Sequence, residues 1–315
     1  MARRSWRAAG LPVRTCATIG ALCFAIFNVP ALAQDADNDI VVEGTLEVDG
    51  TAARAQADAI TQRPASLAEP LARWQDRICA GVSGLSVGNA EALINRMYDT
   101  AELVGLRINE TPGCNGNVWV IVVDDAAETV AQLQAENSWM IRGLSPSDVD
   151  RLAAQEGPVR AWNVVSNKDS NGAAVATGHD LVPQNIQMRQ QNEVPMTIVT
   201  NMSRLQAGIR LDIDLAVMLV DRSAILDFDA FTLADYAAMR LFVRTDQPVS
   251  AGAYNSITSL FVDDLAPARL TPFDRAYLRS SNQGDPYRPV SRGMASFDEL
   301  MEQELLREAG QLPEE

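Results

Sequence analysis

Histidine and lysine are almost missing from this sequence of 315 residues, which contains one of each, His179 and Lys168. One histidine excludes the His-Glu-x-x-His motif of zinc peptidases and any site that needs three histidines. His179 with Asp180 would supply two members of a catalytic triad, but the residues around Ser83 do not form the Gly-x-Ser-x-Gly pattern of a serine nucleophile. The sequence therefore predicts no metal site, no cofactor and no identifiable catalytic residue.

Motifs for phosphate and calcium are missing as well. The glycines of residues 81–88, GVSGLSVG, match neither the dinucleotide-binding pattern nor the P-loop, and no stretch has the spacing of a calcium loop. Acidic residues are plentiful, and close pairs of them can act as acid and base in hydrolysis. Three such pairs stand out: Asp212 with Asp214, Asp227 with Asp229, and Asp263 with Asp264. Because the chain has 41 acidic residues, a hydrolase that uses carboxylates or a serine without metal is kept as an alternative hypothesis.

Positive charge is scarce relative to negative charge. Lysine and arginine together number 26 against 41 acidic residues, and the net charge is −15 at pH 7. A surface this acidic repels the phosphates of nucleic acids and of anionic lipids. We therefore expect no nucleic-acid partner. The expected partner is an unknown envelope protein or a small ligand.

Apolar runs are longest in the first 33 residues. Arg3, Arg4, Arg7 and Arg14 mark a basic start, and an apolar run leads to the sequence Ala-Leu-Ala at residues 31–33, which is typical of a secretory signal peptide. No later run is long enough to cross a bilayer. We expect cleavage near Ala33, a periplasmic or secreted location, and no stable insertion into the membrane.

Cysteine is scarce too, with four in the chain. Cys16 and Cys23 lie in the predicted signal peptide, which leaves Cys79 and Cys114 in a compartment that oxidises thiols. The spacing of these two excludes a Cys-x-x-Cys redox motif, and a nucleophilic thiolate would not stay reduced there. We predict a structural disulfide between Cys79 and Cys114.

The mature chain divides into three parts by composition. Residues 34–70 have no sustained apolar face and predict a flexible lead-in; within them, Asp39–Gly44 (DIVVEG) resembles the short motif near the start of TonB-dependent receptors. This motif motivates a second alternative, a module that interacts with outer-membrane transport machinery. Residues 71–291 predict a single α/β domain with a loop break near 166–180, and residues 292–315 an acidic, amphipathic C-terminal helix.

Strand and helix patterns alternate along the predicted domain. Residues 117–125 are a nearly continuous apolar run, which indicates a strand buried on both faces. Every second residue from Leu205 to Leu219 is apolar, which indicates a long strand that enters the middle of a sheet. With predicted helices between the strands, the order favours an α/β (α+β) fold with a mixed sheet and helices packed on its faces.

Three later helices have start signals. Thr232 and Asp235 predict a capped helix at 233–243, mostly apolar and therefore buried. Thr271, Pro272 and Asp274 give the same kind of signal for the next helix. For the last helix we expect Ser296 and Glu299 as the cap, with Glu304 at the edge of its apolar stripe.

Four blocks of the chain resemble a family of secreted alphaproteobacterial proteins of unknown function. They are RWQDRICAGVSGL, GCNGNVWVIVVDD, TLADYAAMRLFVRT and LTPFDRAYLRSSN, within residues 73–282. A weaker resemblance, in the order of elements after residue 232, links the chain to zincin-like proteins of unknown function. It implies a degenerate zincin-like layout in which the helix at 233–243 replaces the metal-binding helix. Asp235, Tyr236, Met239 and Arg240 then stand where the metal ligands would be.

Taken together, these patterns favour a non-catalytic binding or envelope-associated protein. The two alternatives stated above, a metal-free hydrolase and a transport-associated module, stay open at this point.

Overall fold

The computed structural model describes residues 49–64, 68–175, 207–248, 250 and 252–312, which all fall in the structural unit of residues 45–315. The predicted signal peptide, Asp39–Gly44 and His179 lie outside the described residues, so the expectations attached to them stay predictions.

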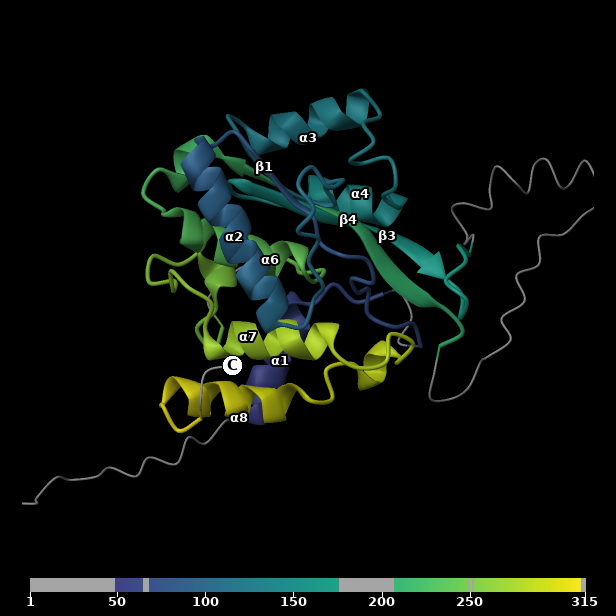
Figure 1. Ribbon diagram of the computed structural model, residues 1–315, viewed down its shortest axis with the longest axis vertical. Helices are drawn as coiled ribbons and strands as arrows, with labels where there is room; N and C mark the ends of the chain where they lie inside the picture. Colours follow the sequence, from purple (N-terminus) through teal and green to yellow (C-terminus); the bar gives the residue numbers. More distant parts are fainter. Residues whose placement is uncertain (1–48, 65–67, 176–206, 249, 251, 313–315) are drawn as a thin grey trace, which may run out of the picture. The chain divides into compact units, whose positions relative to one another are not determined.

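A mixed, open sheet of four strands in the order β1-β2-β4-β3 forms the middle of the fold (Figure 1). β1 (Ala80–Ser83), β2 (Val118–Val123) and β4 (Arg210–Asp221) run parallel, and β3 (Val159–Lys168) pairs antiparallel with β4. The strand predicted from alternation in residues 205–219 is thus an inner strand, paired on both edges. The predicted α/β fold with a mixed sheet is confirmed.

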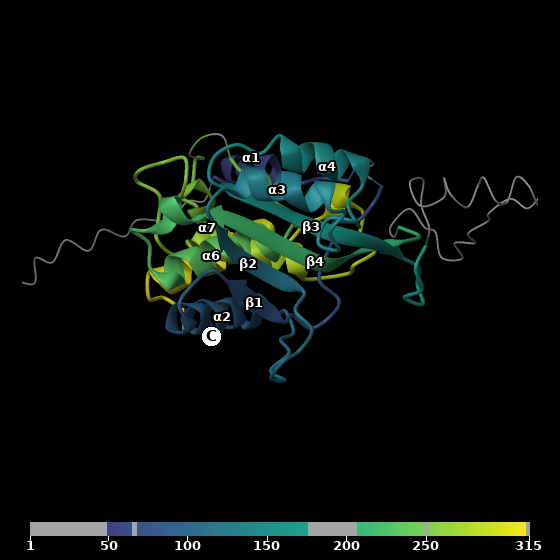
Figure 2. The same ribbon diagram turned by 90° about the horizontal axis from the view of Figure 1, so that it is seen from above.

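Helices cover both faces of this sheet, as Figures 1 and 2 show. α2 (Val87–Leu103) and α6 (Ala230–Leu241) lie on one face, and α3 (Ala126–Ala135) and α4 (Pro146–Ala153) on the other. Alternate residues of each strand therefore enter two different cores: Val118, Val120 and Val122 pack with α2 and α6, whereas Trp119, Ile121 and Val123 pack with α3 and α4. Burial on both faces is the physical reason for the continuous apolar run of β2.

A further helical layer lies beyond α6 and consists of α1 (Gly50–Ile60), α7 (Pro272–Asn282) and α8 (Phe297–Glu308) (Figure 1). Short 3₁₀ helices connect the layers: η1 (Arg222–Ile225), η2 (Ile257–Ser259) and η3 (Val290–Arg292). Because the sheet covers α6 on one side and the extra layer on the other, every residue from 232 to 241 is buried. This confirms the predicted core helix.

Helix α1 corrects the expectation of a flexible lead-in for the described part of residues 34–70. The Asp49 carboxylate caps the helix by accepting hydrogen bonds from the N–H groups of Thr51 and Ala52. Ala53, Ala57 and Ile60 lie in the main core. Two of these three core positions are alanines, which have too little hydrophobicity to mark an apolar stripe, so the sequence pattern did not reveal the helix.

The start of α6 also differs from the expectation. Asp229, not Thr232, is the N-cap, and its carboxylate accepts a 2.7 Å hydrogen bond from the Thr232 N–H. Asp235 takes no part in the cap because its carboxylate is held by Arg96 of α2. By contrast, Thr271 and Asp274 form the predicted capping box of α7.

The last helix packs on the body of the protein, against α7 and α1. Ser296 is its N-cap, but its side chain makes no capping hydrogen bond. Glu304, which was expected at the edge of the apolar stripe, is instead buried, with 1% of its surface exposed. Its carboxylate accepts hydrogen bonds from Arg275, Arg279 and Arg307, which compensate the buried charge.

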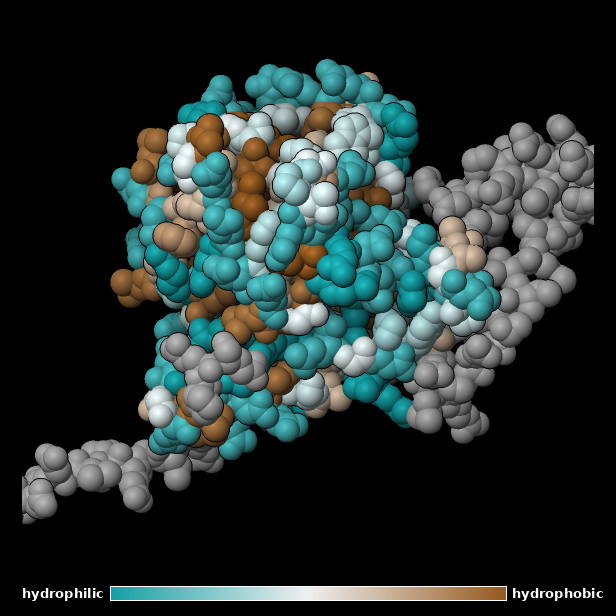
Figure 3. Space-filling model, in the orientation of Figure 1, coloured by the Kyte–Doolittle hydropathy of each residue, from teal (hydrophilic) through white to brown (hydrophobic). Residues whose placement is uncertain are grey.

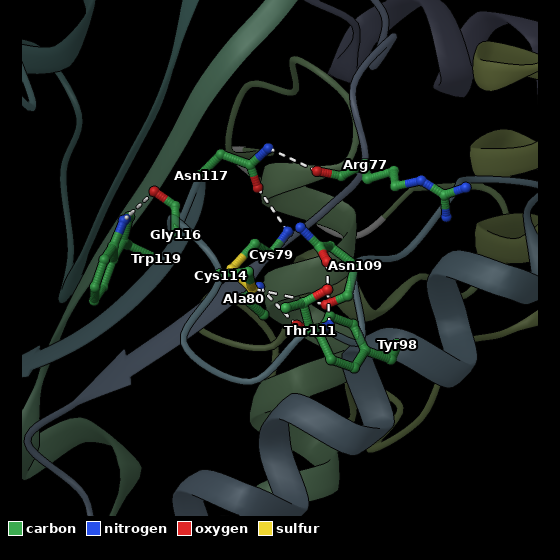
Figure 4. The surroundings of a disulfide bond; sticks show 10 residues. All are labelled: Arg77, Cys79, Ala80, Tyr98, Asn109, Thr111, Cys114, Gly116, Asn117 and Trp119. Atoms are coloured by element: carbon green, nitrogen blue, oxygen red, sulfur yellow. Dashed lines mark hydrogen bonds between the residues drawn. A yellow bond between two sulfur atoms is a disulfide. The ribbon is translucent and has the colours of Figure 1, made fainter.

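Cys79 and Cys114 form a disulfide, with Cα atoms 6.1 Å apart (Figure 4). Next to it, the amide of Asn117 accepts a hydrogen bond from the Cys79 N–H and donates one to the Arg77 carbonyl. The Cys79 carbonyl in turn accepts from the N–H groups of Asn117 and Val118. The bridge therefore ties the loop that precedes β2 to the start of β1.

Replacing both cysteines with alanine should lower the free energy of unfolding by about 3–4 kcal/mol, because the bridge restricts the unfolded chain across 35 residues. Urea unfolding measures the loss. The wild type under dithiothreitol should fall to the stability of the double variant, and the variant itself should not respond to the reductant. Equal stability of the oxidised wild type and the variant would contradict a structural bridge.

Candidate functional site

In the part of the chain that the structure describes, the three acid pairs do not join into a cluster of three or more acids. Asp212 is buried and paired with Arg210 at 2.9 Å, whereas Asp214 is exposed. Asp229 caps α6 and forms an ion pair with Arg269, which together with the cap lowers its pKa. The other three members, Asp227, Asp263 and Asp264, are half-buried or exposed. The structure thus uses two of these acids for ion pairs and helix capping.

Among the described residues, no three histidine, cysteine, aspartate or glutamate side chains are grouped closely enough to hold a metal ion. In the same part of the chain, no helix has both the length and the apolar character needed to cross a bilayer.

A cavity of about 470 Å³ lies between α1 and the segment that links α6 to α7. Figure 2 shows the light-green linking segment on the side of the molecule where α1 lies. The α1 side of the cavity is one helix face, with Ala52, Ala55, Gln56 and Ala59 at helical spacing. Three of these four side chains are single methyl groups, and this is why space is left in front of the helix. The opposite face of α1 fixes it to the core.

Gln56 holds the linking segment at its distance from α1. Its amide group donates a 2.8 Å hydrogen bond to the Tyr254 carbonyl and accepts one of 2.8 Å from the Tyr254 N–H. Gly252 approaches the same amide so closely that a Cβ atom there would lie 2.2 Å from its carbonyl carbon. A side chain at residue 252 would displace Gln56, so the glycine is required for this contact.

The opposite wall of the cavity is fixed by a buried carboxylate. Thr258 and Ser259 of η2 line the cavity together with Ser256. The Ser256 hydroxyl donates a 2.5 Å hydrogen bond to Asp274, which also accepts from the N–H groups of Ile257 and Thr271. Asp274 therefore joins η2 to the start of α7, and its burial raises its pKa to about 6.

The interior of this cavity is mainly apolar, with amide and hydroxyl groups. Asp263 is the single ionisable carboxylate among its lining residues, and it accepts a hydrogen bond from the Leu265 N–H within its own turn. The remaining polar side chains are those of Gln56, Gln247, Ser250, Tyr254, Asn255, Ser256, Thr258 and Ser259. Such a lining suits a small apolar molecule that is oriented by a few hydrogen bonds.

A smaller cavity of about 260 Å³ lies at the carboxyl ends of the parallel strands, between α2 and the start of α6. Apolar side chains are exposed around it, with Val87 and Leu226 each 75% exposed. In Figure 3, apolar groups gather over the amino end of α2, where this cavity lies. It is smaller than the cavity at α1 and offers fewer side-chain hydrogen-bonding groups.

The four positions of α6 where the zincin-like layout would place metal ligands have different environments. Asp235 is fully buried and accepts hydrogen bonds of 2.6 and 2.9 Å from Arg96, and a third from the Leu270 N–H. Met239 lies in the apolar core. Tyr236 and Arg240 are buried, and neither the Tyr236 hydroxyl nor any Arg240 side-chain nitrogen has a hydrogen-bond partner. The sequence showed two charges on an apolar helix, but not that one of them lacks a partner.

Comparisons with models of protein families, with curated proteins and with solved structures find no match for this chain. The resemblance to secreted alphaproteobacterial proteins and the zincin-like layout therefore stay predictions from the sequence.

Breaking the Arg96–Asp235 ion pair should destabilise the fold strongly. Arg96→Ala leaves a carboxylate that is fully buried, and such a loss costs about 3–5 kcal/mol. We expect the lower end, about 3 kcal/mol, because Arg96 itself is 32% exposed and water can partly replace it. Urea unfolding gives the value.

The matched control is Arg54→Ala, which breaks an ion pair with Asp298 whose side chains are 44% and 47% exposed. It should cost less than about 1 kcal/mol. Adding Asp235→Asn to Arg96→Ala should recover part of the loss. Equal effects of the two arginine substitutions would contradict the role of burial.

Asp274 should leave a signature in the pH dependence of stability. Its pKa is raised from 3.8 to about 6 in the folded state, so the folded protein binds this proton more tightly than the unfolded chain does. The contribution of this proton to the free energy of unfolding is fully present below about pH 4 and is lost as the pH rises to about 6. The difference in free energy of unfolding, wild type minus Asp274→Asn, should therefore decrease by about 3 kcal/mol across this interval.

Urea unfolding of both proteins at several pH values measures that difference. Because the other carboxylates are the same in both proteins, their contributions cancel in the subtraction. Asp298→Asn, at an exposed position, should show a difference that changes little over the same interval. A difference that grows as the pH rises would mean that Asp274 is held ionised in the fold.

Proposed function

We propose that this chain is a non-catalytic binding protein of the cell envelope that holds a small, mainly apolar molecule in the cavity beside α1. The observation that carries the proposal is the cavity itself. Its volume of about 470 Å³ lies in the range of small-molecule sites, and its lining is mostly apolar with a few polar groups.

The internal hydrogen bonds of the cavity favour binding over catalysis. The Ser256 hydroxyl is bonded to Asp274 and to Thr258, and the Ser259 hydroxyl donates to the Ser256 carbonyl. A serine nucleophile needs a base that removes its proton, whereas Asp274 already accepts further hydrogen bonds from backbone N–H groups. These hydroxyls support the wall and give little ground for the alternative of a hydrolase.

Export from the cytoplasm is part of the proposal. The disulfide between Cys79 and Cys114 supports it, because structural disulfides persist in oxidising compartments. The signal-peptide pattern of residues 1–33 supports the same location. The alternative of a transport-associated module rests on residues 39–44 alone, which lie outside the described residues.

The proposal can be tested with N-phenyl-1-naphthylamine, a neutral apolar dye whose fluorescence rises in an apolar site. The wild type should bind the dye saturably. Ala55→Trp should weaken binding at least tenfold, because residue 55 is an exposed alanine whose enlarged side chain fills the cavity without entering the core.

Ala131→Trp is the matched control, since Ala131 is an exposed alanine of α3 on the opposite face of the sheet. It should bind the dye like the wild type. Equal binding by the wild type and Ala55→Trp would show that the cavity is not the binding site.

A further inference from the structure

Arg240 is the most unusual side chain in the described part of the protein. It is 1% exposed, and its Nε, Nη1 and Nη2 atoms all lack a hydrogen-bond partner. A buried guanidinium is normally paired, because its five N–H donors lose water without any replacement. Two buried acids of the surrounding helices are already engaged: Asp235 is bound to Arg96, and Asp274 accepts from Ser256 and from backbone N–H groups.

The Tyr236 hydroxyl is a second unpartnered donor in the same place. Tyr236 precedes Arg240 by four residues, so both side chains lie on one face of α6. Burial raises the pKa of Tyr236, and the positive charge of Arg240 acts in the opposite direction. Together they supply hydroxyl and guanidinium donors with no acceptor.

On this face of α6, Tyr236 contacts the segment that follows η2. Arg240 and Tyr236 do not themselves line the cavity beside α1. The Tyr236 ring packs edge-on against Phe261, with ring centroids 4.9 Å apart, and α6 contacts η2 itself. Thr258 and Ser259 of η2 line the cavity beside α1. One short 3₁₀ helix thus contacts both the helix that carries the unpaired donors and the proposed binding cavity.

We propose that Arg240 and Tyr236 form the anion-binding end of this cavity, and that the ligand is an apolar molecule with one carboxylate. This inference rests on the proposed binding function and names its ligand class. The carboxylate accepts hydrogen bonds from the guanidinium and from the tyrosine hydroxyl, while the apolar part occupies the space in front of the alanines of α1. Because the Arg240 nitrogens are inaccessible to water in the structure, η2 has to shift away from α6 when the ligand binds.

A pair of probes that differ in charge tests the proposal: decanoate and 1-decanol, at pH 8, by displacement of the neutral dye and by calorimetry. The wild type should bind decanoate at least tenfold more tightly than decanol. Arg240→Met should remove this preference and leave the affinity for decanol within about twofold of the wild type. The ligand-free Arg240→Met variant should unfold at the same or a higher temperature, because it loses an unpaired buried charge.

Two further variants keep the test independent of folding effects. Tyr236→Phe, which removes only an unpartnered hydroxyl, should lower the preference for decanoate about threefold. Arg142→Met, at an exposed arginine beyond α3, should keep the full preference. If the wild type shows no preference, or if Arg240→Met keeps it, the proposal is wrong.

The outcome also separates this inference from the proposed function. Equal binding of both probes, blocked by Ala55→Trp, would leave the binding cavity in place and overturn the anion site. Binding of decanoate alone, dependent on Arg240 but unaffected by Ala55→Trp, would support the anion site and overturn the cavity beside α1. Binding of neither probe would overturn both.

Discussion

The burial of α6 on all sides is the constraint on which the rest of the structure depends. A helix between a sheet and a second helical layer has no solvent-facing side, so a charge that it carries requires a partner to offset the cost of its burial. Asp235 meets this requirement through Arg96 of α2 and the Leu270 N–H. One carboxylate thereby fixes α2, α6 and the segment before α7 relative to one another.

The same principle orders the outer layer. Asp274 accepts hydrogen bonds from residues at the starts of η2 and α7, and Glu304 accepts from arginines of α7 and α8. Asp274 and Glu304 lie in the outer helical layer of α1, α7 and α8. In this layer, α1 contributes few large apolar side chains. The directional contacts of Asp274 fix the position of η2, and those of Glu304 join α7 to α8. The cavity beside α1 exists because this polar framework holds its walls while the alanines of α1 leave the space between them.

Much of the central fold could be predicted from the sequence, because its signals are local. The alternation in residues 205–219 identified β4, and the capping signal at Thr271 and Asp274 identified the start of α7. Helix α1 was missed because its contact face is largely alanine. The cap of α6 was misplaced by three residues because both Asp229 and Thr232 are good capping residues, and only the tertiary demand of Arg96 for Asp235 decides between them.

The candidate site could not be predicted in the same way. The Gln56 contact that sets the width of the cavity joins residues 198 positions apart, and no local pattern encodes it. The alanine-rich turns of α1 that line the cavity have no marked apolar stripe, so their sequence alone resembles that of a flexible linker. Asp235 and Arg240 could both be recognised as charges on an apolar helix. That Asp235 is paired and Arg240 is not depends on tertiary contacts, because only a neighbouring helix can supply the partner.

The unpaired state of Arg240 does not reflect a shortage of acidic residues. The chain carries 41 acids against 26 basic residues, and its buried acids Asp212, Asp235, Asp274 and Glu304 all have partners. Arg279, another buried arginine, is paired with Glu304. In a protein this rich in acidic residues, a single substitution could place a carboxylate opposite Arg240. That carboxylate would remove the cost of a buried, unpaired charge. An internal acid at that point would also occupy the place of an incoming one, and this is the physical reason why the unpaired guanidinium of Arg240 favours the proposed ligand, which brings its own negative charge.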